Sequence, residues 1–93
     1  MNIYFLKDIE DDFIMWTITA KSLKEMERVL NHYLTNLHEV NDYERTAEMS
    51  DESESPVLVR VYDKYKDESN WYPSGEYVVL TRQYSPDKVY DLV

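Results

Sequence analysis

The pattern of apolar and polar positions near the start of the chain predicts two β-strands. Residues 13–20 are rich in β-branched and aromatic side chains, which favour extended structure. In an extended chain Ile14, Trp16 and Ile18 share one face, and the residues between them share the other. Residues 2–7 form a second apolar run, and the acidic stretch between the two runs is then a hairpin connection longer than a two-residue turn.

A helical repeat follows these strands. Apolar side chains recur at intervals of three or four residues, and this spacing predicts an amphipathic helix from about 23 to 38: Leu23, Met26, Leu30, Tyr33 and Leu37. Ser22 and Glu25 have the spacing of a capping box, in which the serine hydroxyl accepts a hydrogen bond from a first-turn amide. The helix is therefore expected to begin just after Ser22.

The second half of the chain begins with residues 39–55, which contain few apolar side chains and several Ser, Asn and Asp. We expect a long surface loop there, with partial disorder or a short helical turn as alternatives. Two further strands are predicted at 57–65 and 76–84, with a turn at 73–75 between them. The last residues, 89–93, form either a short closing segment or a tail that docks on a partner.

The predicted order of elements is therefore β-β-α-β-β in a single domain that spans residues 1–93. Two hairpins that flank one helix are most economically arranged as an α+β fold. We expect a four-stranded, mainly antiparallel sheet with the amphipathic helix packed on one face. A chain of this size buries about two thirds of its unfolded surface, which is enough for one modest core.

The charge of the chain is concentrated in two stretches. The formal net charge is −9; residues 8–12 contribute −4, residues 39–54 contribute −6, and the remainder sums to +1. This excess argues against direct binding to nucleic acid or to an anionic membrane. It favours a cationic partner, with simple solubility as the alternative explanation.

The residue types present exclude several kinds of chemistry. The chain has no cysteine, so it forms no disulfide and has no thiolate metal ligand or thiol nucleophile. Gly75 is the only glycine, and one glycine cannot build a phosphate-binding loop. His32 and His38 are six residues apart on the predicted helix and do not share a face. We therefore expect no enzyme, no catalytic residue, no cofactor and no bound metal.

The same features indicate a location in the cell. The first residues lack the basic and apolar regions of a signal peptide, and no apolar run approaches the roughly 20 residues that span a bilayer. A small domain without disulfides fits a reducing compartment. We expect a cytoplasmic protein.

Aromatic side chains add to the candidate partner-binding residues. The chain has nine tyrosines, and tyrosine supplies a large contact area with few rotatable bonds. Trp71 and Tyr72 lie in a polar connection, where they either fold back over the core or contact a partner. The candidates are these two aromatics and acids from both stretches: Asp8, Glu10, Asp11, Asp12, Glu44, Glu48, Asp51, Glu52, Glu54, Trp71 and Tyr72.

The leading functional hypothesis is a non-enzymatic inhibitor that occupies the basic, nucleic-acid-binding groove of a partner enzyme. Spaced carboxylates would take the place of phosphates there. In size, acidity and scarcity of glycine the chain resembles the small acidic inhibitors that bacterial viruses use against host defence enzymes, such as anti-CRISPR and anti-restriction proteins. The alternative is a small homodimeric interaction or regulatory domain that uses its tyrosine-rich sheet face or an edge strand. The inhibitor hypothesis expects folding to gather both acidic stretches into one negative surface.

Overall fold

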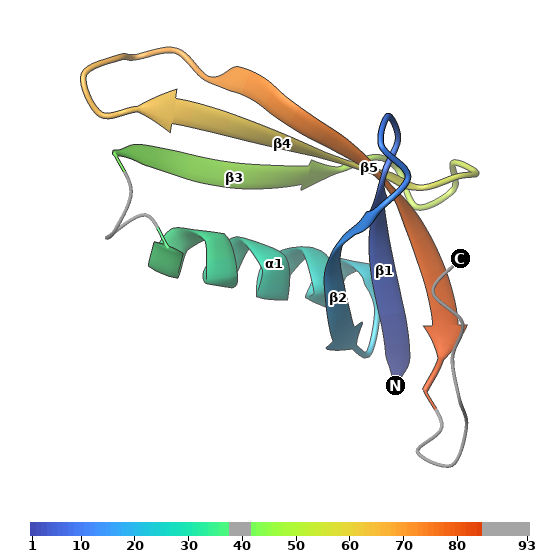
Figure 1. Ribbon diagram of the computed structural model, residues 1–93. Helices are drawn as coiled ribbons and strands as arrows, with labels where there is room; N and C mark the ends of the chain where they lie inside the picture. Colours follow the sequence, from blue (N-terminus) through green and yellow to red (C-terminus); the bar gives the residue numbers. More distant parts are fainter. Residues whose placement is uncertain (38–41, 85–93) are drawn as a thin grey trace.

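One helix and five strands make up the described part of the chain. The computed structural model describes residues 1–37 and 42–84 (Figure 1). The elements follow in the order β1 (Asn2–Asp8), β2 (Ile14–Ala20), α1 (Leu23–Leu37), β3 (Tyr43–Met49), β4 (Leu58–Tyr65) and β5 (Tyr72–Gln83). The strands form one sheet in the order β2-β1-β5-β4-β3, and every neighbouring pair is antiparallel. The predicted α+β class, the first hairpin and the helix are confirmed.

The sheet has five strands where the sequence predicted four. The prediction of a loop over 39–55 is wrong for Tyr43–Met49, which form the edge strand β3. Its inner face, toward α1, carries the buried Ala47 beside the half-buried Arg45, and its outer face is polar. The alternation of apolar and polar residues is hard to recognise in this strand, because one of its inward residues is charged and another is small. Residues 38–41, where the predicted helix was to end, lie outside the described residues.

The predicted turn at 73–75 is also wrong, because these residues lie inside β5, which begins at Tyr72. A bulge absorbs the turn-like sequence: the register with β4 shifts between Val61 and Tyr62. Gly75 is required at this point, because a Cβ atom there would lie 2.5 Å from the Tyr77 hydroxyl. The predicted closing segment at 89–93 lies outside the described residues.

β5 connects the two halves of the sheet. Its C-terminal half pairs with β1 over Tyr77–Gln83, and its N-terminal half pairs with β4 over 72–78. Twelve extended residues span about 40 Å, so β5 is long enough to serve both hairpins at staggered positions. Figure 1 shows the sheet curling around α1: β3 and β4 extend alongside the helix, whereas β1 and β2 lie near its beginning.

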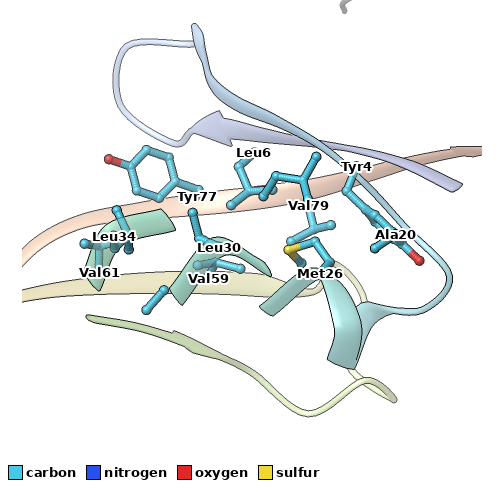
Figure 2. Packing of buried hydrophobic residues seen from close by; sticks show 12 residues of the cluster. Tyr4, Leu6, Ala20, Met26, Leu30, Leu34, Val59, Val61, Tyr77 and Val79 are labelled. Atoms are coloured by element: carbon cyan, nitrogen blue, oxygen red, sulfur yellow. The ribbon is translucent and has the colours of Figure 1, made fainter. Parts of the chain in front are cut away.

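The hydrophobic core fills the space between α1 and the inner face of the sheet. Met26, Leu30 and Leu34 are fully buried on one face of the helix. Figure 2 shows them directed at side chains of the sheet, such as Val59, Val61 and Val79. The sheet contributes Tyr4, Leu6, Ile18, Ala20, Ala47, Val59, Val61, Tyr77 and Val79 to this cluster. The helix therefore depends on one apolar seam, and a change of Leu30 to Ala would cost about 2–5 kcal/mol of stability.

Side chains of the helix also form hydrogen bonds with backbone groups at the outer edge of β3. The Asn31 side-chain oxygen accepts a hydrogen bond from the Ala47 amide at 2.8 Å, and the Asn31 side-chain nitrogen donates to the Ala47 carbonyl at 2.9 Å. The Glu27 carboxylate accepts from the Met49 amide at 2.8 Å. An exposed strand edge invites pairing with other chains. Side chains of α1 take the place of a sixth strand at this edge.

We expect Asn31→Ala to destabilise the protein by about 1–3 kcal/mol, because the amide and carbonyl of Ala47 lose their partners in a half-buried place. Urea unfolding followed by circular dichroism measures the change. Asn36→Ala is the matched control: it is the same substitution on the same helix, at an exposed residue whose side-chain nitrogen lies 3.4 Å from the His32 ring and bonds to no strand among the described residues. Equal effects of the two substitutions would show that the edge bonds add nothing.

Candidate partner-binding surface

The first acidic stretch forms an ordered loop between β1 and β2. One carboxylate oxygen of Asp8 accepts hydrogen bonds from the amides of Glu10 at 2.8 Å and Asp11 at 2.9 Å. The Asp8 amide donates to the Phe13 carbonyl at 2.8 Å, and the Asp12 amide donates to the Asp8 carbonyl at 3.2 Å. Asp12 has a φ of 64°, in the left-handed region that aspartate enters more readily than most residues. Asp8 therefore holds the loop together from within.

The four carboxylates of this loop have different environments. Asp8 binds backbone amides, and Asp12 forms an ion pair with Lys7 at 3.0 Å. Glu10 and Asp11 are exposed, and no Lys or Arg side chain within residues 1–37 and 42–84 lies within ion-pair distance of either. Two of the four acids thus keep the loop in shape, and the other two present charge to solvent.

The β1–β2 loop lies beside the N-terminal half of β5. The Ile9 amide donates to the Glu76 carbonyl at 3.2 Å. Asp8 and Glu10 line a shallow depression of about 310 Å³ together with Arg60 and residues 73–76. The loop therefore extends from β1 toward Tyr72, and its own apolar residues Ile9 and Phe13 are 48% and 43% exposed.

A group of exposed aromatic side chains lies at the end of β5 that this loop approaches. Trp71, Tyr72 and Tyr65 are 43–50% exposed. Lys64 joins them to β3, because its ammonium lies 5.8 Å from the centre of the Trp71 ring and 3.8 Å from a Glu44 carboxylate oxygen. We call this region the aromatic end. The structure thus brings together three of the predicted residues, Glu44, Trp71 and Tyr72.

Electrostatics modify one phenol at the aromatic end. The pKa of Tyr72 is raised, chiefly by its hydrogen bond to the Glu68 carboxylate. The hydroxyl of Tyr72 therefore stays protonated to higher pH than a free tyrosine, and it remains a hydrogen-bond donor. An exposed ring with a polar tip of this kind can anchor an interface.

A partly buried ion pair lies beneath the aromatic end. The Arg45 guanidinium donates to both carboxylate oxygens of Asp63, at 2.7 and 3.0 Å. This hydrogen bonding raises the pKa of Arg45, and Asp63 is only 7% exposed. Arg45 also lies 5.1 Å from the centre of the Tyr43 ring, which packs edge-on against Tyr65. Sequence analysis missed this pair; its signals were one base within an acidic stretch and one acid within an apolar strand.

The second acidic stretch is divided between β3 and the loop that follows it. Glu44 and Glu48 lie on the outer face of β3, directly opposite Lys64 and Arg60 of β4. Opposite charges at paired positions favour this pairing of strands. Glu44 forms an ion pair with Lys64 at 3.8 Å, whereas the ion pair of Arg60 is with Glu76, at 3.7 Å. Glu44 therefore adds less free charge than its sequence suggests.

The remaining acids, Asp51, Glu52 and Glu54, lie in the loop between β3 and β4. Val57, at the end of this loop, accepts a hydrogen bond from the Val79 amide at 2.9 Å. The loop therefore extends beside β5 in the direction opposite to that taken by the β1–β2 loop, on the other flank of the strand. The structure does not bring Asp51–Glu54 together with Asp8–Asp12.

The tyrosines are distributed over the core and the surface. Tyr4 and Tyr77 are 2% and 5% exposed and belong to the core beneath α1. The pKa of Tyr77 is raised, chiefly by burial, and its ring packs against Trp16 with the ring centres 5.1 Å apart. Tyr62 is half-buried on the outer face of the sheet, and Tyr84 is exposed. The sheet therefore uses two of its tyrosines for packing.

Two other kinds of site, a metal centre and a membrane-spanning helix, are absent from residues 1–37 and 42–84. No three His, Asp or Glu side chains in these ranges converge closely enough to hold a metal ion. No helix of the described residues is long and apolar enough to cross a membrane. His32 is exposed on α1, and His38 lies outside the described residues. Comparisons with protein-family models, curated proteins and solved structures find no match.

The loop between β3 and β4 offers a test of local order. The Asp51 carboxylate accepts hydrogen bonds from the amide and the hydroxyl of Ser53, at 2.9 and 2.8 Å, and these bonds lower its pKa. Their contribution to stability is present above the ordinary pKa of aspartate and is lost as the pH falls through the lowered value. In Ser53→Ala we expect the pKa of Asp51 to move up toward the ordinary value in a carboxyl NMR titration.

Ser55→Ala is the control for this titration, because Ser55 is an exposed serine of the same loop with no hydrogen bond to Asp51. It should leave the pKa of Asp51 where it is. An unchanged pKa in Ser53→Ala as well would mean that the loop does not hold this turn in solution.

Proposed function

We propose that this protein is a non-enzymatic inhibitor that occupies a basic, nucleic-acid-binding groove of a partner enzyme. The observation that carries the proposal is the ordered β1–β2 loop, which holds Glu10 and Asp11 exposed and, among the described residues, outside ion-pair distance of any Lys or Arg. Lysine and arginine side chains that bind phosphates bind carboxylates by the same charge-assisted hydrogen bonds. The loop presents negative charge in a form that such a groove accepts.

Order in the loop matters for affinity. A flexible acidic segment loses conformational entropy when it binds, whereas a segment fixed beforehand loses little. Asp8 supplies this order by binding two successive backbone amides, and Ile9 ties the loop to β5. Glu10 and Asp11 therefore project from a backbone that is already in place.

The apolar surface beside the charged loop adds binding free energy to the electrostatic attraction. Charge steers two proteins together, but most of the free energy of a stable interface comes from a few large side chains. Ile9 and Phe13 flank the two free carboxylates, and Trp71 and Tyr72 lie further along β5 in the same direction. We propose that the partner contacts the loop first and the aromatic end second.

The proposal assigns no catalytic role to the acidic residues. Asp8, Glu10 and Glu76 line one depression, but Asp8 is engaged in holding the loop and Glu76 lies 3.7 Å from the Arg60 guanidinium. A paired acid and base for catalysis require a desolvated pocket that separates their pKa values, and this depression is shallow. Such an inhibitor would act in the cytoplasm, like the small acidic inhibitors that bacterial viruses direct at host defence enzymes.

We expect Glu10→Gln combined with Asp11→Asn to abolish binding to the partner. The tagged protein is used to capture bacterial proteins at about 50 mM and about 500 mM NaCl, because exposed charges are screened at the higher salt. Mass spectrometry should identify a nucleic-acid-processing enzyme that is captured only at low salt. A labelled DNA duplex bound to that purified enzyme should then be displaced by the wild-type protein and not by the double variant.

Glu52→Gln combined with Glu54→Gln is the matched control, because it removes the same charge from the other loop. It should retain most of the displacement activity. Equal losses in the two double variants would show that net charge acts rather than the β1–β2 loop. Capture that persists at high salt, or that does not involve a nucleic-acid-binding surface, would overturn the proposal.

A further inference from the structure

The two edge strands of the sheet, β3 and β2, differ in the hydrogen bonding of their outer backbone groups. Side chains of α1 satisfy the outer edge of β3 at Ala47 and Met49. β2 is the other edge strand and pairs only with β1. Within residues 1–37 and 42–84, no side chain or further strand bonds to the backbone of β2 on the side away from β1. Alternate amides and carbonyls along that side therefore face outward, as at any strand edge.

The sequence of β2 lacks the features that protect strand edges. Residues 13–20 contain no charged residue and no proline, in a chain of which 31% of the residues are charged. Natural proteins protect exposed edges with lysine, proline or bulges. The one irregularity in β2 lies at its start, where the register with β1 shifts between Leu6 and Lys7. From Trp16 to Ala20 the edge is regular and uncharged.

An apolar groove runs along this edge. It has a volume of about 480 Å³ and lies between β2 and α1, with Met15, Trp16, Val29 and Tyr33 among its lining residues. Met15 and Tyr33 are 40% and 49% exposed, and Phe13, just before β2, is 43% exposed. A strand added to β2 would place alternate side chains in this groove and the others on the outer face of the sheet.

We propose that a second copy of this chain occupies the β2 edge. Two β2 strands would pair antiparallel about a two-fold axis at Thr17, the midpoint of the strand, and the two sheets would become continuous. Trp16 would then lie opposite Ile18 of the other copy, beside the groove on the α1 side. In a two-fold pairing of this kind, both copies contribute the same residues to the interface.

The charges at the ends of β2 favour this arrangement. Asp12 precedes the uncharged run and Lys21 follows it. In the antiparallel pairing about Thr17, Lys21 of one copy lies opposite Phe13 of the other, one residue from the partner's Asp12. Both side chains are exposed, so an antiparallel dimer brings opposite charges near each other at both ends of the contact. A parallel pairing would place like charges side by side instead.

The distribution of charge over the whole chain points to the same edge. Two copies of a protein with a net charge of −9 repel each other unless their contact surface carries little charge. The run 13–20 is neutral, and the acids Glu10 and Asp11 lie at the tip of the neighbouring loop, beyond the end of the proposed contact. The dimer therefore leaves the free carboxylates of the proposed inhibitory loop on the surface, and the two proposals are independent.

Sedimentation equilibrium tests the dimer. For the wild-type protein the average mass should rise from 11.2 kDa toward twice that value between about 1 and 300 µM, the range over which a micromolar complex forms. Thr17→Lys places two lysines opposite each other at the two-fold axis, and we expect it to weaken the dimer at least tenfold. The same change reduces the net negative charge, so general repulsion alone predicts the opposite result.

Thr81→Lys is the matched control, because Thr81 is an exposed threonine on β5 that is separated from the β2 edge by β1. It should leave the association unchanged. Circular dichroism checks that both variants fold. The chain has no cysteine of its own, so Thr17→Cys adds a single thiol. Opposed residues of an antiparallel pair have Cβ atoms about 4.5–5.5 Å apart, and mild oxidation should cross-link this variant but not Thr81→Cys.

Several results would overturn the proposal. A wild-type protein that remains monomeric at about 300 µM would exclude a micromolar dimer. A dimer that survives Thr17→Lys and forms no Thr17→Cys cross-link would use another face. If Thr17→Lys instead abolished capture of a different protein, the edge would serve a strand of that partner. If Thr17→Lys abolishes the dimer but not capture of the partner, the inhibitor proposal stands. If Glu10→Gln with Asp11→Asn abolishes capture of the partner but not the dimer, the dimer proposal stands.

Discussion

The packing of one helix into a curled sheet is the constraint on which the rest of this structure depends. Met26, Leu30 and Leu34 are the helix's fully buried apolar side chains, and they must cover the inner faces of strands that belong to two different hairpins. A single helix can do this only if the sheet bends around it, so that β2 and β3 both approach α1. Asn31 and Glu27, on the same helix, then reach the backbone of β3. The helix therefore both fills the core and completes one edge.

This arrangement places the candidate surface. β5 pairs with β1 over one half and with β4 over the other, so the two acidic loops leave it on opposite flanks and in opposite directions. The β1–β2 loop turns toward Tyr72, whereas Asp51–Glu54 lie toward the C-terminal half of the strand. The inhibitor proposal consequently rests on a smaller surface than the sequence suggested: two free carboxylates, their apolar neighbours and the aromatic end. That surface is more ordered than a charged loop usually is, because Asp8 holds it from within.

Local signals were sufficient to predict the helix and the first hairpin. The Ser22 hydroxyl accepts a hydrogen bond from the Glu25 amide at 3.2 Å, as the spacing of the two residues indicated. β3 could not be predicted from local pattern. Its inner face carries the charged Arg45, which can lie beside the core only because it pairs with Asp63, eighteen residues later in the sequence. Trp71 and Tyr72 are 43% and 46% exposed, and their contact with a partner stays a prediction. Their position beside Glu44 depends on the register of β3, β4 and β5, which no local pattern encodes.

Segregation of charge lets one small chain carry two surfaces with opposite physical character. In the proposed function, the free carboxylates of the β1–β2 loop attract a cationic partner through exposed charges, and added salt weakens such attraction. The β2 edge is uncharged, and the force that opposes its self-association is the repulsion between two chains of charge −9. Added salt screens that repulsion, so the same change in conditions strengthens the dimer while it releases the partner. Salt therefore separates the two proposed interactions without any substitution, because each interaction depends on the charge of a different part of the chain.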